Sequence, residues 1–227
     1  MKFCLTSPKG GVGKTTLAVI IASEAVRHGQ TVTLVEADPN GHLKDWYNKN
    51  LCPNEVSFIF DDDPSGGKIQ NHIEAAAQKT DIVIIDTEGT VNRRADISGQ
   101  LANIVAIPLQ FSNLDLKGAL SAYNSLVQAE NISGAIIPKL LVPNKVSSAI
   151  RTKDETNIRN AIHEANIPLC NPGILDKSAF RQMMAIGCLL HDLPQHTDIN
   201  NIQPAFDNAQ SLLSNMIQYF QQTIEDA

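Results

Sequence analysis

A glycine-rich loop between an apolar run and a helical pattern constrains the fold more than any other stretch. The residues SPKGGVGKTT, Ser7 to Thr16, follow the run KFCLT and lead into an amphipathic segment. Glycines allow backbone conformations and close approaches that side chains would block. The loop feeds the N-terminus of a helix, where unpaired N–H groups and the helix dipole attract phosphate. This order of strand, loop and helix predicts a phosphate-binding loop.

The residues of this loop have separate tasks in binding a nucleotide. Lys14 is placed to reach the β- and γ-phosphates, and the Thr15 hydroxyl is placed to bind Mg²⁺. The loop departs once from the pattern G-x-x-x-x-G-K-S/T, because Pro8 stands where the first glycine belongs and Lys9 follows it. We expect the nucleotide to be bound by Gly10, Gly11, Val12, Gly13, Lys14, Thr15 and Thr16.

Short apolar runs recur along the whole chain. Most of them, such as IVIID and KLLV, are continuously apolar, which is typical of strands covered on both faces in a parallel sheet. The candidate strands are Lys2–Thr6, Thr31–Glu36, Val56–Phe60, Ile82–Asp86, Ile104–Pro108 and Ile136–Val142, with a further one near Pro168–Asn171.

Helical patterns separate these runs. They cover Thr15–His28, Lys68–Lys79, Leu114–Glu130, Thr152–Ala165, Ser178–Leu189 and Pro204–Thr223. Alternation of this kind implies right-handed crossovers and a ligand site at the carboxyl ends of the strands. We therefore expect a three-layer, doubly wound α/β fold with a mostly parallel sheet flanked by helices, forming one domain over residues 1–227.

Composition excludes several classes of protein. The chain of 227 residues is 43% hydrophobic and has a net charge of −6, which argues against a surface uniformly coated for nucleic acid. It shows no signal peptide and no run of about 18 apolar residues, so we expect a cytoplasmic protein. The four cysteines are scattered without a CxxC pair, a spacing that favours neither a metal site nor disulfides.

The segment KGGVGKTT resembles the deviant Walker A motif of the partition-ATPase and Min-ATPase family, a branch of the P-loop NTPases. In that family too the position of Pro8 is not glycine, and a lysine at the place of Lys9 is the signature. The resemblance covers nearly the whole chain and extends to small ATPases that serve plasmid partition and transfer-DNA processing. It implies an ATPase whose weak hydrolysis of ATP to ADP and phosphate a partner stimulates.

The resemblance also implies a catalytic role for Lys9. In the family, two subunits enclose two ATP molecules face to face, and each signature lysine reaches the phosphates held by the partner. A cation supplied in trans stabilises the charge on the transferring phosphate, as arginine fingers do with effects of about 10³–10⁵ in rate. We expect Lys9 and Lys14 to be catalytic, and the chain to form a homodimer in the ATP state.

Two carboxylates at strand ends complete the expected centre. Asp38, in EADPNG, stands where the family places the switch carboxylate that orients the attacking water, so we count it as catalytic. Asp86 ends the apolar run of a Walker B-like element, DIVIIDTEG, and a carboxylate there holds magnesium or its water. We expect Thr15, Asp38 and Asp86 to form the magnesium site.

Three nearby residues depart from the family pattern or extend it. Glu36 replaces the first aspartate of the family's D-x-D-P-Q-G segment, and its role stays open. Glu88 stands where many relatives have proline and is unassigned, whereas Gly89 would let the backbone approach the γ-phosphate. Asn144, after the strand KLLVP, occupies a place that lies by the adenine in the family. Since no complete NKxD follows, ATP is preferred over GTP.

Cellular function follows from the resemblance and from the distribution of cations. The first hypothesis is an ATP-dependent dimer that binds DNA non-specifically and positions plasmid or transfer DNA, with hydrolysis as the release switch. It includes a small DNA-binding adaptor that stimulates hydrolysis, and it would place the protein on the nucleoid. Scattered cations that dimerisation could gather into a phosphate-binding surface are Arg151, Lys153, Arg159, Lys177 and Arg181.

Two alternatives share the scaffold. A membrane-cycling ATPase of the Min type needs a basic amphipathic C-terminal helix, but SLLSNMIQYFQQTIEDA ends in acids and carries no cation, so no membrane partner is expected. A metabolic ATP-dependent ligase or reductase needs groups for a second substrate. The scattered cysteines argue against an iron–sulfur reductase, whereas a small-molecule ligase stays open.

Overall fold

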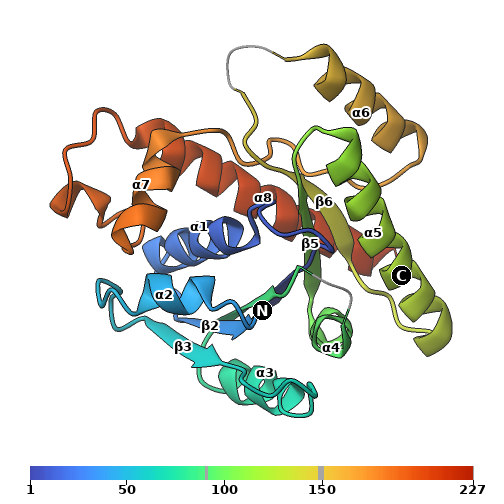
Figure 1. Cartoon of the computed structure of the whole chain (residues 1–227), viewed down its shortest axis with the longest axis horizontal. Coiled ribbons are helices and arrows are strands. Elements are labelled where there is room, and N and C mark those ends of the chain that lie inside the picture. The colour runs from blue at the N-terminus through green and yellow to red at the C-terminus, as the bar shows by residue number, and fades with distance from the viewer. Residues whose placement is uncertain (90–91, 148–150, 227) are drawn as a thin grey trace.

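Six strands form one parallel sheet in the computed structural model, which describes residues 1–89, 92–147 and 151–226 (Figure 1). They are β1 (Lys2–Leu5), β2 (Val32–Ala37), β3 (Val56–Phe60), β4 (Ile82–Thr87), β5 (Ile104–Leu109) and β6 (Lys139–Pro143). The order is β3-β2-β4-β1-β5-β6, and every pairing is parallel. The central strand β1 lies at the switch in winding direction, where such sheets bind ligands.

Helices cover both faces of this sheet. They are α1 (Lys14–Arg27), α2 (His42–Tyr47), α3 (Ile69–Ala77), α4 (Arg93–Leu101), α5 (Asn113–Ser133), α6 (Lys153–Glu164), α7 (Ser178–Ile186) and α8 (Gln203–Glu225), with a 3₁₀ turn at Leu193–Gln195. One face packs against α1, α2, α7 and α8, and the other packs against α3, α4, α5 and α6 (Figure 1). The predicted three-layer α/β architecture is confirmed.

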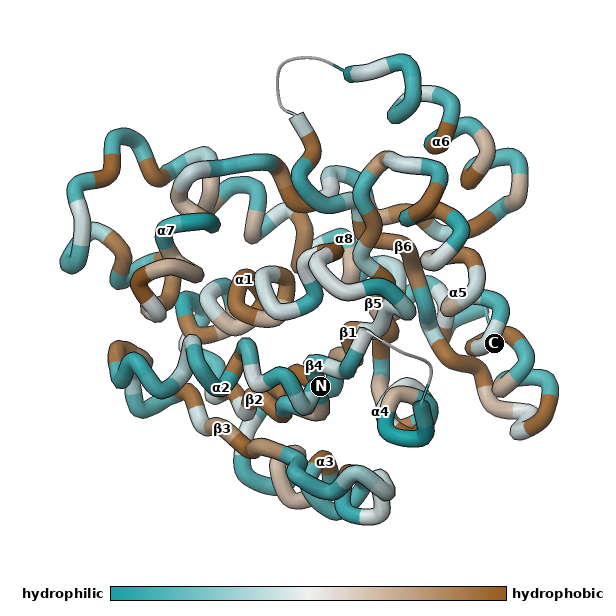
Figure 2. Tube along the Cα trace, viewed as in Figure 1, coloured by the Kyte–Doolittle hydropathy of each residue, from teal (hydrophilic) through white to brown (hydrophobic). Residues whose placement is uncertain are grey.

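Two apolar cores lie on the two faces of the sheet. Along β1, Phe3 and Leu5 enter one core, and Cys4 between them enters the other; all three side chains are fully buried. Figure 2 accordingly shows hydrophobic segments along the strands and mixed colours along the helices. Strands buried on both faces must be apolar at every position, which explains their continuous runs.

The expected element boundaries need correction at two places. The segment near Pro168–Asn171 makes only an isolated bridge, through Leu169 and Leu141, so it is not a seventh strand. The strand expected from Ile136 begins at Lys139, because the preceding Ile137 N–H donates to the Glu130 carboxylate over 2.7 Å and leaves the ladder.

Two helices, α2 and α4, were not expected from the sequence. Both are short and polar, and α4 contains Gly99, which disfavours a helix. In the fold, a Cβ on Gly99 would lie 3.1 Å from Leu126 of α5, so the glycine permits close packing between these helices. Packing against residues far along the chain therefore helps to stabilise α4, which local pattern does not indicate.

The long helix α8 buries its apolar side against the core on the α1 face. Ala205, Ala209, Leu212 and Met216 are each no more than 2% exposed. Within the described residues, no helix combines the length and the apolar character needed to cross a membrane. The apolar residues that the sequence shows in this segment are thus used in packing the fold.

Candidate functional site

The phosphate-binding loop joins β1 to α1 and depends on glycine. Gly11 and Gly13 have φ angles of 76° and 106°, a region that favours glycine. A Cβ on Gly13 would stand 1.9 Å from the Asn144 side-chain nitrogen, so no other residue fits there. Lys14 begins α1 and is only 6% exposed. The loop therefore presents backbone N–H groups and a helix N-terminus, as a phosphate site requires.

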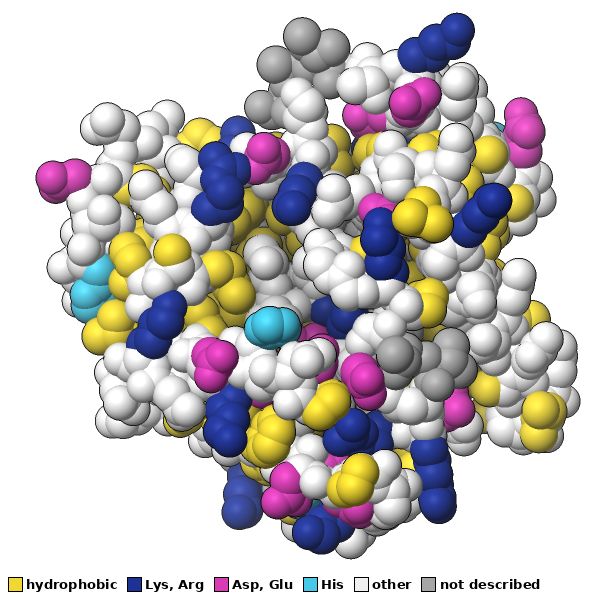
Figure 3. Space-filling view, in the orientation of Figure 1, with side chains coloured by type: hydrophobic (Ala, Val, Ile, Leu, Met, Phe, Trp, Pro, Cys, Tyr) yellow, Lys and Arg dark blue, Asp and Glu magenta, His cyan; other side chains and the backbone are white. Residues whose placement is uncertain are grey.

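A hollow of about 720 Å³ adjoins this loop. Its lining brings together the loop, the carboxyl ends of β2 and β4, and residues of α2 and α7. The space-filling view shows it opening between α2 and α7, with apolar side chains inside and lysine or arginine at the rim (Figure 3). A phosphate loop beside a partly apolar hollow of this size suits a nucleotide.

Asp86 and Thr15 meet beneath the phosphate loop. The Thr15 hydroxyl donates to Asp86 Oδ2 over 2.7 Å. The Asp86 side chain is 1% exposed, and among the described residues its Oδ1 has no hydrogen-bond partner. Burial, opposed by Thr15 and by the charge of Lys14, raises the pKa of Asp86 to about 6. A buried carboxylate with an unused oxygen beside a hydroxyl fits the ligand preference of Mg²⁺.

Asp38 lies at the end of β2 and lines the same hollow. Its Oδ1 accepts hydrogen bonds from the backbone and side-chain nitrogens of Asn40, each over 2.9 Å. Only 8% of the residue is exposed. These contacts fix the carboxylate at the wall of the hollow, while its role towards water or metal stays a prediction.

Glu36 caps α2. Its two carboxylate oxygens accept hydrogen bonds from the backbone N–H groups of Leu43 and Lys44, each over 2.8 Å. The residue is fully buried, and burial raises its pKa to about 7 against the opposing effect of these two bonds. The longer glutamate thus reaches the orphan N–H groups of a helix start, a use that only the tertiary structure reveals.

Lys9 forms an ion pair with Asp115 of the same chain. Asp115 is 4% exposed, and its backbone N–H donates to Ser112 over 3.1 Å, as a helix cap does. The lysine side chain keeps 41% exposure, and the pair borders a second, polar hollow of about 400 Å³. The signature lysine is therefore held in cis at the surface.

The main chain after β4 lies against the phosphate loop. A Cβ on Gly89 would stand 2.9 Å from the Gly10 nitrogen, so this glycine permits the approach. Beside Asp86, the Thr87 hydroxyl donates to the Leu5 carbonyl over 2.9 Å and so links β4 to the neighbouring strand β1. Glu88 lines the hollow.

Asn144 lies against the phosphate loop. Its side-chain nitrogen donates to the Val12 carbonyl over 2.6 Å, and its oxygen accepts from the Lys145 N–H over 2.8 Å. The residue is 4% exposed. The structure thus shows a link from β6 to the phosphate loop, and contact with a base stays a prediction.

Sequence reasoning missed one wall of the hollow. Residues 174–177 line it, in a loop that α8 holds. Asn208 accepts from the Leu175 N–H and donates to the Gly173 carbonyl, each over 2.9 Å. Asn208 is 4% exposed, and a buried polar residue on an otherwise apolar helix side was the available signal.

The five candidate DNA contacts fall in different settings. The guanidinium of Arg159 bonds to buried Glu155 over 2.8 Å and lies 4.6 Å from the Phe111 ring centre. Lys177 and Arg181 line the nucleotide hollow. Arg151 and Lys153 are exposed at the start of α6. The structure therefore does not bring the five into one patch on a single chain.

Comparisons with known proteins agree with this architecture. A family model described as VirC1 protein matches residues 1–225. Protein ParA of Rhizobium radiobacter is 27% identical over 207 residues, which cover 91% of each chain. Apo McdA of Cyanothece superposes with a TM-score of 0.73 at 18% identity, over 93% of this chain and 98% of that one.

The septum site-determining protein MinD of Pyrococcus horikoshii, in complex with Mg-ADP, has the same fold. It superposes with a TM-score of 0.68 at 15% identity, over 96% of this chain and 94% of that one. The family match extends over nearly the whole sequence and agrees with the deviant phosphate loop and the parallel sheet. The chain belongs to the VirC1 protein family, among the partition- and Min-type ATPases.

Proposed function

We propose that this protein binds ATP with Mg²⁺ and hydrolyses it to ADP and phosphate. The observation that carries the proposal is the buried Asp86, bonded to Thr15 through one oxygen and unpartnered within the described chain at the other. A similar fold binds Mg-ADP in MinD of Pyrococcus horikoshii, which supports the same ligand class here. Thr15, Asp86 and Asp38 would hold the magnesium ion or its waters.

Each residue has a distinct task in this reaction. Lys14 and the loop N–H groups bind the phosphates, and Asp38 orients the water that attacks the γ-phosphate. The magnesium ion, when bound, neutralises charge on the phosphate oxygens. Because phosphoryl transfer is catalysed largely by positioning and by charge stabilisation, such a centre hydrolyses slowly until a further cation arrives.

That cation is Lys9 of a second subunit. ATP closes a homodimer in which Lys9 leaves Asp115 and reaches the phosphates bound by the partner. The half-exposed lysine, held close to the phosphate loop, supports this exchange. Hydrolysis removes the γ-phosphate and opens the dimer, so nucleotide state controls assembly.

The ATP-bound dimer binds DNA non-specifically and positions plasmid or transfer DNA, and a small DNA-binding adaptor stimulates hydrolysis to release it. The similarity to ParA of Rhizobium radiobacter supports this role. Arg151 and Lys153, exposed at the start of α6, are the first candidates for phosphate contact. The proposal includes no membrane partner, because α8 packs its apolar side on the core.

Solution mass with ATP and Mg²⁺ tests the switch. Wild type should form a dimer with ATP and return to monomer as ATP is consumed. Asp38→Ala should remain dimeric, since it binds ATP without hydrolysing it. Lys9→Ala should lose stimulation in trans while still binding ATP. A wild type that stays monomeric under saturating ATP would contradict the proposed dimer.

A further inference from the structure

The loop of residues 174–177 and the start of α7 form the apolar side of the nucleotide hollow. Ile174, Leu175, Phe180 and Met184 line the hollow there. Apart from Trp46, the lining residues that follow β2 are polar or charged: Asp38, Asn40, His42, Asp45 and Lys49. Because an aromatic base binds best against apolar side chains, we expect the base of a nucleotide to lie on the side of this loop.

All four backbone N–H groups of the loop already have partners within the chain. Those of Ile174 and Asp176 donate to backbone carbonyls at the end of β6 and just after it, over 2.7 and 2.9 Å. That of Lys177 donates to the Leu175 carbonyl over 2.9 Å. That of Leu175 donates to the side-chain oxygen of Asn208 over 2.9 Å. The main chain of the loop therefore has no donor left for a ligand.

Acceptors, by contrast, remain. A carbonyl oxygen can accept two hydrogen bonds, and the carbonyls of Ile174 and Leu175 each accept one from the backbone. For the Asp176 carbonyl, no hydrogen bond is recorded within the described part of the chain. Adenine carries an amino group at position 6, which donates, whereas guanine carries a keto oxygen there, which accepts. A wall that can only accept suits the first group and repels the second.

Asn208 keeps the loop in this state from outside the hollow. The residue is 4% exposed, and its side-chain nitrogen donates to the Gly173 carbonyl over 2.9 Å. A Cβ on Gly173 would lie 2.2 Å from the Pro143 carbonyl oxygen, so the loop begins pressed against β6. The loop is thus held between β6 and α8. Without Asn208, the Leu175 N–H would be free to donate to a ligand.

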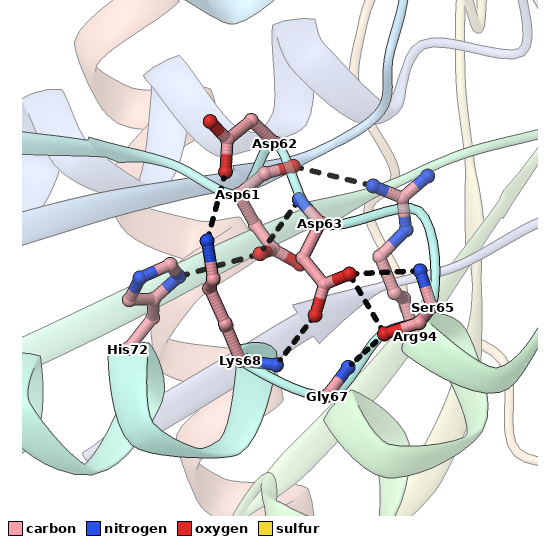
Figure 4. A network of polar contacts seen from close by, with 8 residues as sticks. All are labelled: Asp61, Asp62, Asp63, Ser65, Gly67, Lys68, His72 and Arg94. Carbon is pink, nitrogen blue, oxygen red and sulfur yellow. Dashed lines mark hydrogen bonds and ion pairs between the residues drawn. The ribbon is translucent and has the colours of Figure 1, made fainter.

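A polar network around Asp61 also lies at the carboxyl edge of the sheet, but away from this loop (Figure 4). It follows β3, whereas residues 174–177 bond to the end of β6, and β3 and β6 are the two outer strands. Its groups pair with one another: the Lys68 N–H donates to the Asp63 carboxylate over 3.1 Å, and Arg94 donates to the Asp61 carbonyl over 3.2 Å. Among the described residues that line the hollow, none belongs to this network.

We propose that the loop at 174–177, held by Asn208, selects the nucleotide by the group at position 6 of its purine. The loop carbonyls accept from a 6-amino group and exclude a 6-keto oxygen. Asn208 does not touch the base; it is a positioning residue, which withdraws the Leu175 N–H from the hollow. This inference rests on the proposed binding of ATP and names the residue on which the choice of base depends.

Calorimetric titration of the wild type with three triphosphates that differ in the group at position 6 tests this selection. ATP carries an amino group, purine riboside triphosphate a hydrogen, and inosine triphosphate a keto oxygen. Affinity should fall in that order, by about tenfold or more from the first to the last, because an acceptor that faces an acceptor leaves both unpaired. Equal affinity for ATP and inosine triphosphate would overturn the inference and leave the proposed function intact.

Asn208→Ala tests the positioning role. It frees the Leu175 N–H, so the preference for ATP over inosine triphosphate should shrink by about fivefold or more. Affinity for inorganic triphosphate should stay unchanged, because the phosphate loop is held by Asn144 instead. A variant that keeps the full preference for ATP, or that loses affinity for ATP and for triphosphate equally, would overturn the inference.

Asn215→Ala is the matched control. Asn215 also lies on α8, but its side-chain nitrogen donates to the Ser211 carbonyl of the same helix over 2.7 Å. This variant should keep the base preference of the wild type, and thermal unfolding should report whether both variants fold. A wild type that binds none of the three nucleotides would overturn the proposed function as well.

Discussion

Asn144 connects two parts of the site through one side chain. It donates to the Val12 carbonyl, and the space that it occupies requires glycine at position 13. In this position it acts on the shape of the phosphate loop, whatever base is bound. The family resemblance implied a contact with adenine, and affinity measurements separate the two roles.

In Asn144→Ala, affinity for ATP, GTP and inorganic triphosphate should fall together. The buried Val12 carbonyl loses its partner, which costs about 1–3 kcal/mol, or roughly 5–150-fold in Kd if the bound loop bears the whole cost. Calorimetric titration of the three ligands measures this. Loss of ATP affinity with unchanged binding of triphosphate would instead favour base recognition.

In the proposed dimer, Asp115 would compete with the partner's phosphates for Lys9. In Asp115→Asn the ion pair is lost while an oxygen remains to accept from the Gln110 N–H, which now bonds over 3.2 Å. Lys9 no longer has to leave a carboxylate, so the ATP-dependent dimer should form at lower protein concentration. Sedimentation in an Asp38→Ala background, where ATP persists, measures the effect. Weaker dimerisation of the double variant would contradict competition.

At the scale of elements, Glu36 helps to hold the start of α2. Its N–H groups bond to a carboxylate in the preceding strand. Burial disfavours the charged form of Glu36 and raises its pKa from 4.5 to about 7. A carboxyl group whose folded pKa is raised stabilises the fold less as it ionises. Its contribution therefore declines as pH rises from about 4.5 to about 7.

Thermal unfolding of the nucleotide-free protein should show this decline between those pH values. Asp86, with a pKa raised to about 6, contributes in the same direction. Adding Mg²⁺ and nucleotide should remove the part of the pH dependence that comes from Asp86, because a cation favours its charged form. The part that comes from Glu36 should remain. Glu36→Gln should be less stable overall, with a flatter profile. If Glu36→Gln leaves the slope of unfolding temperature against pH unchanged, another group is responsible for the decline in stability.

The sequence predicted elements well where apolar periodicity and local caps agree. The six sheet strands and the helices with apolar faces were expected at or near their observed ends. It failed at α2 and α4, where stability comes from Glu36 and from packing against Gly99. The same distinction holds for the functional site. The phosphate loop and strand-end acids were visible as motifs, whereas the partners of Lys9 and Asn144 depend on contacts between distant segments.

At the scale of the whole molecule, the cations near α6 differ in how far they are exposed. Arg159 and Arg151 both form ion pairs with Glu155, over 2.8 Å and 3.7 Å, but the Arg159 side chain is 15% exposed and the Arg151 side chain 62%. Lys153 also lies at the surface. A DNA surface should therefore depend on Arg151 and Lys153. That the 227 residues form one domain also stays a prediction.

Replacing Arg151 and Lys153 together with alanine should weaken DNA binding by the ATP-bound dimer. Each lost phosphate contact should reduce the slope of log affinity against log salt by about 0.9. Binding to duplexes of different sequence, titrated with salt, measures both effects. Arg159→Ala is the comparison, because it removes the closer of the two cations that pair with buried Glu155 and should therefore lower thermal stability. An unchanged slope in the double variant would place the DNA surface elsewhere.

Asn208 of α8 bonds to Leu175 and Gly173, and these contacts affect when, during synthesis, the protein can bind its ligand. The hollow combines residues near Gly10 with a loop at 174–177, which backbone hydrogen bonds tie to residues 143–146 and which Asn208 of α8 holds from the other side. A nascent chain can complete its strands in order, but its nucleotide pocket is unfinished until residue 208 has left the ribosome. We therefore expect nucleotide to bind a nearly finished molecule, so that the proposed ATP-dependent dimer would form only from chains that include α8.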